Sequence, residues 1–363
     1  MLLARAVALL SGLTLVFLTL MSAIRIFVLP RNAADKIAGF VFRVTRRLFN
    51  LRNAFSRSYL ERDRVMALYA PIGLLTLLLT WLALMVLGYA AMFWASGEGL
   101  WDAFRISGSS LLTLGFAFPA GLPGTLLGYS EAAFGMILTA LLISYLPTMY
   151  GAFSRREAAV TLLEVRAGPL PGSADYDGGA PSAVNMLRRF HALGEIAALT
   201  PLWAGWEQWF VELEESHTSL AALAFFRSPS PNRSWVTAAG VVLDAAALRL
   251  STIDLPFDVY ASLCLRAGFV ALRSIASYFL LPYDPDPHPD DPISISREEF
   301  EQAYAELLAA GLPLKADRDQ AWRDFAGWRV NYDTVLLGLC RLTMAPPSRW
   351  ASDQTRRAGR MGS

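Results

Sequence analysis

Three long stretches without a charged residue limit what this chain can fold into. They are Ala6–Ile24, Ala70–Ala95 and Ala132–Ser154. A helix needs about 20 apolar residues to cross a hydrocarbon core of about 30 Å, so each stretch is long enough to span a membrane. Residues 155–363 read as ordinary water-soluble sequence. The chain is therefore predicted to have a membrane part followed by a soluble part.

The first stretch could also be a secretory signal peptide. Its apolar core is long for a signal peptide, and no clear small-residue cleavage site leads into a mature soluble domain. We therefore predict a retained transmembrane helix within residues 1–29. A basic segment over residues 30–69 follows it, and residues 70–154 form a module of two spans with a loop between them.

Basic residues predict the orientation of the spans. Residues 25–64 carry ten lysines and arginines against three acids, whereas residues 96–131 carry Arg105 as their single basic residue. Cytoplasmic loops are enriched in lysine and arginine. We expect a multi-pass protein of the cell membrane, with its N-terminus and residues 96–131 outside and its C-terminal part in the cytoplasm.

Residues 37–60 predict a basic amphipathic helix. Such a helix suits the inner headgroup layer of a bilayer, and a cuff packed on the cytosolic domain is an equal alternative. The apolar residues at helical spacing are Ile37, Phe40, Val41, Val44, Leu48, Leu51 and Phe55.

The soluble part reads as mostly α-helical because its apolar residues recur at helical spacing and strands do not alternate with the helices. Val259–Leu281 is apolar enough to suggest another span, but Arg266 and Arg273 favour a buried soluble helix whose arginines find carboxylate partners. The predicted segments are a Gly/Pro-rich connector and linker at 155–181, a helical domain at 182–281, a Pro/Asp strap at 282–295, a helical pair at 296–345 and a disordered tail at 346–363.

The outward segment 96–131 is the most informative part of the sequence. After Arg105 no charged residue appears before Glu131, so the segment is too apolar for a solvated loop and too short for two further spans. A re-entrant segment resolves this conflict, because irregular backbone at membrane depth is tolerated when it is buried in protein or lines an aqueous cavity. Leu100–Leu112 predicts a short helix, after which residues 113–119 turn back outward.

The order span, short helix, T-L-G-F strand, span resembles the pore module of potassium channels, whose selectivity filter reads T-V-G-Y-G. The resemblance covers residues 70–155. Together with the charge-free stretches and the helical soluble part, it predicts an all-α membrane protein with three transmembrane helices, a re-entrant pore loop between the second and third, and a cytosolic helical domain. The filter positions implied by the resemblance are Thr113, Leu114, Gly115, Phe116 and Ala117.

The resemblance also implies four copies around one axis in a lipid bilayer. Main-chain oxygens of residues 113–117 and the Thr113 hydroxyl would coordinate a permeating monovalent cation, K⁺ or Na⁺, and no other cofactor or metal is implied. Ala117 replaces the second filter glycine and Phe118 replaces the acid that follows it. A non-glycine residue in a left-handed conformation costs about 1–2 kcal/mol, so weak selectivity is expected.

The third span would line the inner cavity. Pro147 removes the hydrogen bond to the carbonyl of Ile143 and suggests a hinge, although proline is also common in membrane helices generally. The residues expected at the constriction are Leu142, Tyr145, Leu146 and Met149.

Other function classes find little support in the sequence. The net charge of +1 gives no reason to expect a nucleic-acid partner, and no catalytic motif set predicts an enzyme. Glu214, Glu215 and His217 are predicted to lie on a solvated or salt-bridged helix face rather than in a metal site. The alternatives to a channel are a non-conducting membrane scaffold or sensor and, without catalytic residues behind it, a membrane-anchored enzyme. A cytosolic ligand or protein partner is not identified.

Overall fold

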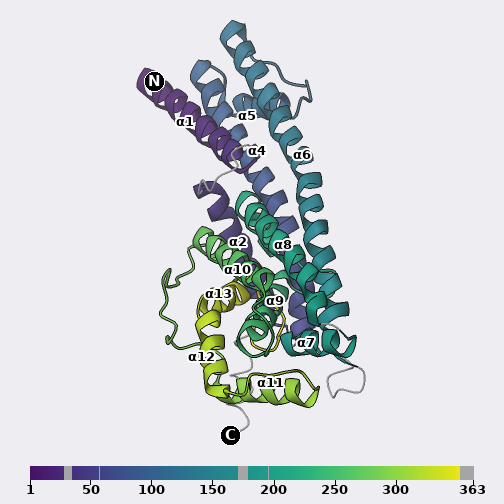
Figure 1. The fold of residues 1–363 in the computed structure, drawn as a ribbon. Coiled ribbons are helices and arrows are strands. Elements are labelled where there is room, and N and C mark those ends of the chain that lie inside the picture. The colour runs from purple at the N-terminus through teal and green to yellow at the C-terminus, as the bar shows by residue number, and fades with distance from the viewer. Residues whose placement is uncertain (28–34, 57, 171–178, 195, 352–363) are drawn as a thin grey trace. The chain divides into compact units, whose positions relative to one another are not determined.

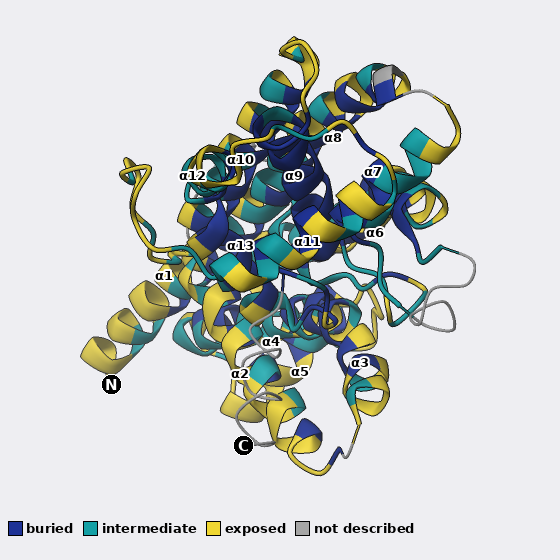
Figure 2. Ribbon diagram, turned by 60° about the horizontal axis from the view of Figure 1, so that its bottom comes forward, coloured by how far each residue is buried: buried dark blue, intermediate teal, exposed yellow. Residues whose placement is uncertain are grey.

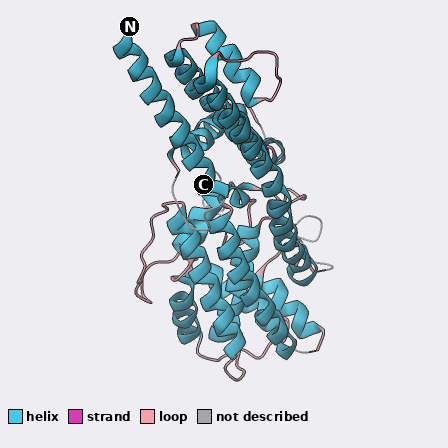
Figure 3. Cartoon of the chain, turned by 90° about the horizontal axis from the view of Figure 1, so that it is seen from above, coloured by secondary structure: helices cyan, strands magenta, loops and turns pink. Residues whose placement is uncertain are grey.

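The structure, a computed structural model, describes residues 1–27, 35–56, 58–170, 179–194 and 196–351. Over these residues every named element is a helix (Figure 3), and Ile253 and Leu314 form one isolated β-bridge. The chain divides into two compact units, Met1–Gly151 and Ala152–Ser363. The predicted all-α class is confirmed.

Six helices belong wholly or partly to the first unit (Figure 1). They are α1 (Leu2–Phe27), α2 (Lys36–Asn53), α3 (Tyr59–Ala67), α4 (Tyr69–Ser96), α5 (Leu100–Leu111) and the first part of α6 (Gly121–Ala167).

Four helical runs among the described residues are long and apolar enough to cross a membrane. They are Leu2–Phe27, Tyr59–Ser96, Gly121–Ala167 and Val259–Tyr278. The first three contain the spans predicted from the sequence. The fourth lies in α10, where the sequence predicts a soluble helix, so length and apolar composition alone do not separate α10 from the spans.

Helices α1 and α4 pack closely because two glycines face each other. A Cβ atom built on Gly12 would lie 2.5 Å from the carbonyl oxygen of Gly88, which no real side chain tolerates. Small residues at such crossings let membrane helices approach backbone to backbone. Farther along, Trp81 Nε1 donates to Ser22 Oγ at 2.9 Å, and Ser22 donates to Asp35 at 2.7 Å. This polar chain also connects to α2, whose first turn is capped by Asp35.

Helix α6 is much longer than the third span predicted at 132–154. It runs without interruption for 47 residues, through Pro147, and is therefore about 70 Å long at 1.5 Å per residue. The segment 121–131, predicted as part of the outward loop, is its first three turns. The predicted connector begins as helix up to Ala167, and most of the remaining linker lies outside the described residues.

The second unit contains α7 (Ala183–Ala192), η1 (Ile196–Leu199), α8 (Thr200–Ser219), η2 (Ala221–Phe225), α9 (Trp235–Ser251), α10 (Val259–Tyr278), α11 (Arg297–Ala309), α12 (Arg318–Arg329) and α13 (Asp333–Thr343). Helix α9 is the centre of its core and is buried along almost its whole length (Figure 2). Trp203, Trp206 and Trp209 of α8 are also buried in this core.

A buried arginine connects the C-terminal helices to α9. Arg329 donates to Asp244 at 2.5 Å, to Asp333 at 2.7 Å and to the carbonyl oxygen of Trp350 at 2.6 Å. A buried charge is tolerated when it is paired and hydrogen-bonded in this way. The contact with Trp350 also corrects the disordered tail predicted from residue 346, because the side chain of Trp350 is buried against Phe325.

Two further expectations for this unit need correction. The helix predicted from Asp317 to Leu342 is two helices, separated at Asn331, whose side-chain amide donates to the carbonyl of Gly327 at 3.0 Å. No carboxylate of the described residues pairs with Arg273. It donates to carbonyl oxygens of Asn331 and Pro285, and to the Asn331 side chain.

Candidate functional site

Helix α5 is held between α4 and α6 by its buried face. Ser107 lies 3.1 Å from the carbonyl oxygen of Val86 in α4 and 2.5 Å from Glu131 in α6. Glu131 is fully buried, although it is the first charged residue after Arg105. A serine that contacts both neighbouring helices fixes the position of α5, and therefore of the loop that leaves its C-terminal end.

The loop 112–120 folds back onto the end of α5 through its amides. Ser109 provides most of the acceptors: its carbonyl accepts from Leu114 N at 2.8 Å, and its hydroxyl oxygen accepts from both Phe116 N and Ala117 N at 3.1 Å. Thr113 N donates to the Ser110 carbonyl at 3.0 Å. The far end of the loop is fixed to the turn between α4 and α5, because Ala120 N donates to Glu98 at 2.9 Å.

The carbonyls of the same loop behave differently from its amides. Within the described residues, no carbonyl oxygen of residues 113–117 accepts a hydrogen bond. Polar backbone groups need partners when they leave water. The loop therefore carries a row of carbonyl oxygens that solvent, a bound cation or another chain could satisfy.

Two loop residues adopt left-handed backbone conformations. Gly115 has φ 71°, as the resemblance to channel filters requires of the first filter glycine, and Thr113 has φ 54°. A β-branched residue with positive φ is an outlier, and Thr113 adopts this conformation as the left-handed residue of the helix cap that ends α5, where Leu114 N bonds to the Ser109 carbonyl and Thr113 N to the Ser110 carbonyl. Ala117 is not left-handed. Ala117 therefore does not carry the backbone strain expected there.

The side chains of the loop are largely exposed in the single chain. Leu114 is 60% exposed, Phe116 58% and Phe118 79%, whereas Ala117 is partly buried against the first unit's core. The Thr113 hydroxyl, expected to coordinate a cation, donates to the carbonyl of Leu112 at 2.8 Å. The apolar side chains would be covered by lipid or by another protein surface.

Helix α6 approaches α5 and the loop through three glycines spaced along one face. A Cβ atom built on Gly124 would lie 2.8 Å from Pro119 Cβ, and one built on Gly135 would lie 2.3 Å from the Leu111 carbonyl oxygen. A Cβ on Gly128 would lie 3.4 Å from Ser110 Oγ. These glycines were not predicted to form a contact face, although their spacing of four and seven residues in the sequence indicates one.

Three of the four residues expected at the constriction lie on a packed face of α6. Leu142, Tyr145 and Met149 are buried, and the Tyr145 ring lies edge-on to Phe27 of α1 at 4.8 Å. Leu146 is 45% exposed and shares its side of the helix with the exposed Ile143 and Tyr150. Residues that line a shared axis must be open in the single chain, so this burial disfavours a pore-lining position for the three.

A second polar cluster surrounds Arg156 in the second unit. Arg156 is buried, pairs with Glu157 at 2.8 Å and donates to the carbonyls of Leu223 and Phe226 at 2.9 and 2.7 Å. His217 Nε2 lies 3.2 Å from Arg156 Nη1. Burial, and then the positive charge of Arg156, lowers the pKa of His217 well below its usual value. The solvated face predicted for this helix is therefore wrong at His217, which is a neutral core residue.

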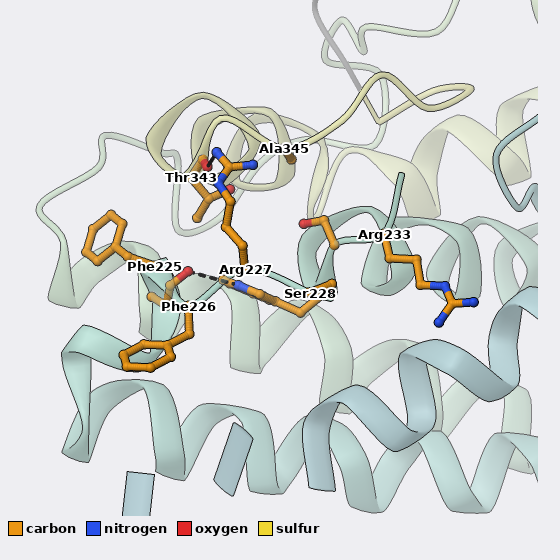
Figure 4. Close-up of a pocket in the computed structure, with 10 residues that line it drawn as sticks. Phe225, Phe226, Arg227, Ser228, Arg233, Thr343 and Ala345 are labelled. Atoms are coloured by element: carbon orange, nitrogen blue, oxygen red, sulfur yellow. Dashed lines mark hydrogen bonds between the residues drawn. The ribbon is translucent and has the colours of Figure 1, made fainter. Parts of the chain in front are cut away.

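The described residues of the second unit offer little room for a ligand beside Arg227. This arginine donates to the carbonyls of Thr343 and Met344 at 2.8 and 3.1 Å, and Figure 4 shows it extending toward Thr343 while Arg233 points elsewhere. The cavity here has a volume of about 20 Å³, enough for a water molecule. No group of three or more His, Cys, Asp or Glu side chains suited to a metal occurs in the part of the chain that the structure describes.

Comparison of the chain with protein-family models, with curated proteins and with solved structures gave no match. The functional conclusion therefore depends on the residues of this chain alone.

Proposed function

We propose that this chain is the pore-forming subunit of a cation channel, in which four copies place residues 113–117 around one aqueous axis. In this proposal α1, α4 and α6 cross the membrane and α5 is the pore helix. Monovalent cations, K⁺ or Na⁺, pass along the main-chain oxygens of the loop. The N-terminus faces outward, and the second unit lies in the cytoplasm.

The different hydrogen bonding of the amides and the carbonyls in the loop supports this proposal. Four amides, those of Thr113, Leu114, Phe116 and Ala117, bond back to α5, and the carbonyls of the same segment have no partner among the described residues. Carbonyl oxygens presented in this way can replace the hydration shell of a cation. The negative end of the α5 dipole, at Leu111, lies at the start of the loop and adds to the attraction.

The same residues set the expected selectivity. The loop has no acidic residue to raise the cation concentration at its mouth, and Phe118, where the resemblance would place one, is exposed. The Thr113 hydroxyl is bonded to Leu112 rather than open as a ligand. We therefore expect weak discrimination between K⁺ and Na⁺, with Leu146 and its exposed neighbours on α6 lining the inner cavity.

Ion flux into liposomes tests this proposal. The full chain should carry K⁺ and Na⁺ down a gradient, and Gly115→Asp should reduce flux to the level of empty liposomes. This substitution puts a side chain at a left-handed position and a charge among the carbonyls. Gly194→Asp is the matched control, because Gly194 is also left-handed, with φ 104°, and has open space around it. Equal flux through both variants would rule out conduction through the loop.

One observation favours the alternative of a non-conducting scaffold or sensor. The exposed side chains of Leu114, Phe116 and Phe118 would suit a loop that packs on another membrane protein as well as one that faces an axis. The mass of the detergent-solubilised particle separates the two functions. Four copies support the channel, whereas one or two copies support the scaffold.

A further inference from the structure

Helix α2 and the turn after it present an apolar stripe that the first unit does not cover. The α2 stripe consists of Phe40, Val44, Leu48, Leu51 and Phe55. Each of these side chains is more than a third exposed, and Phe55 is 81% exposed. At 100° per residue the five positions fall within about a quarter of the helix circumference.

The stripe is not the face by which α2 packs on its own unit. That face carries the buried Val41 and Thr45, and Phe42, whose ring lies against Gly73 of α4. The hydroxyl of Tyr69 donates to the Phe42 carbonyl at 3.2 Å. Since α2 already has its core contact, the stripe is a second apolar face, and its direction is fixed by these contacts.

The contacts with α4 also place the stripe relative to the membrane span. Tyr69 and Gly73 lie at the beginning of the charge-free run of α4, within about 6 Å of each other along the helix axis. Helix α2 therefore lies beside the end of a candidate span rather than beside its middle. This is the level at which hydrocarbon gives way to headgroups.

Arginines border the stripe on both sides. Arg43 and Arg47 fall on one edge and Arg52 on the other, and all three are exposed. No carboxylate of the described residues pairs with any of them, and Arg43 bonds only to the Gly39 carbonyl of its own helix. An apolar strip between unpaired guanidinium groups matches the acyl boundary and the phosphates of an anionic bilayer surface.

We propose that the α2 stripe lies in the headgroup layer of the membrane and that Arg43, Arg47 and Arg52 bind the phosphates of anionic lipids. The stripe lies at the acyl boundary, and the guanidinium groups reach outward to the phosphate level. This inference is independent of whether the loop at 113–117 conducts, because it depends only on α2, its contacts with α4 and its charges.

Spin labels on the full chain test the position of the stripe. A nitroxide at Leu48→Cys, in vesicles of phosphatidylcholine and phosphatidylglycerol, should be more accessible to oxygen than to a water-soluble nickel chelate. A label at Asn50→Cys, which is exposed and lies on the opposite side of α2 from Leu48, should be more accessible to the nickel chelate than to oxygen. Both native cysteines are buried and do not contribute. A Leu48 label shielded from both reagents would show that another protein surface covers the stripe, and one open to the chelate would show that water does. Either result would overturn the proposal.

Arginine substitutions test the lipid chemistry. In neutral detergent micelles, added phosphatidylglycerol should raise the melting temperature of the full chain. The double variant Arg47→Gln, Arg52→Gln should need at least about tenfold more of this lipid to reach half of the maximal rise in melting temperature. The matched variant Arg318→Gln with Arg323→Gln removes two arginines from the second unit and should leave the lipid requirement unchanged. The same lipid requirement in both double variants would contradict the proposal. If the Arg47→Gln, Arg52→Gln variant does not fold, the spin-label measurement tests the proposal on its own.

Discussion

Ser109 shows how a single side chain can determine the shape of the loop. Its hydroxyl oxygen accepts two amide hydrogens, from Phe116 and Ala117, and its carbonyl accepts a third, from Leu114. The carbonyls of residues 113–117 accept no hydrogen bond from the described residues. The strained φ of 54° at Thr113 persists because its neighbours are fixed to α5 in this way.

Replacing Ser109 with alanine should therefore loosen the loop without unfolding the chain. Two hydrogen bonds are lost, each with a net contribution of about 0.5–1.5 kcal/mol. We expect cation flux in liposomes to fall several-fold while the melting temperature changes little. Ser11→Ala is the control, because the Ser11 hydroxyl bonds only to a carbonyl of its own helix. Unchanged flux in Ser109→Ala would show that the loop geometry does not depend on this residue.

His217 should make the stability of the second unit depend on pH. Its pKa is lowered in the folded chain, so as pH falls through about 6.5 the unfolded chain takes up a proton that the folded chain refuses. The free energy of unfolding should fall by up to about 1.4 kcal/mol per pH unit below that point. Denaturant unfolding at several pH values measures this slope.

Two substitutions show whether His217 causes this pH dependence of the free energy of unfolding. His217→Gln keeps a polar group beside Arg156 but removes the titration, so the decline below pH of about 6.5 should flatten. His191→Gln, at a half-exposed site on α7, should keep the decline. If His217→Gln declines as steeply as the parent chain, another group carries the pH dependence.

At the level of elements, the contact between α5 and α6 depends on glycine. Gly135→Ala would force a methyl group against the Leu111 carbonyl oxygen and should destabilise the first unit by about 1–3 kcal/mol. Gly108→Ala is the matched change on α5, where nothing lies within 4 Å, and should be neutral or slightly stabilising. Unfolding in detergent measures both. Equal stability of the two variants would mean that the helices can separate at no cost.

The sequence predicted the helices better than it predicted their contacts. The apolar runs located α1, α4 and the centre of α6, and the order of residues after Arg105 located α5 to within one residue of its end. Charge-free runs mark where a helix can cross lipid, but not where it ends. For this reason α6 extends beyond the predicted span on both sides.

The side-chain partners could not be predicted because they join residues far apart in the chain. Ser107 with Glu131, Arg156 with His217 and Arg329 with Asp244 are separated by 24, 61 and 85 positions. No local periodicity records such pairs. The sequence also does not indicate which face of α6 packs inward, since helical spacing gives only the set of residues that share a face. Leu142, Tyr145 and Met149 were consequently expected at an axis that their burial disfavours.

At the scale of the whole molecule, a pore formed by residues 113–117 requires several copies of the chain. A single loop cannot surround a cation. Within the described part of one chain, the carbonyls of residues 113–117 accept no hydrogen bond, and the side chains of Leu114, Phe116 and Phe118 are largely exposed. Four copies would give the carbonyls a shared aqueous axis. The apolar side chains would then pack between neighbouring copies.

The central claim is tested most directly by distances between copies at the loop. A nitroxide at Leu114→Cys in the reconstituted full chain, measured by pulsed dipolar spectroscopy, should give two short distances related as the side and diagonal of a square. A matched label at Leu193→Cys, exposed in the second unit, controls for distances that arise from crowding alone. The absence of a short distance at Leu114, or a single distance from a pair of copies, would contradict a pore formed by residues 113–117.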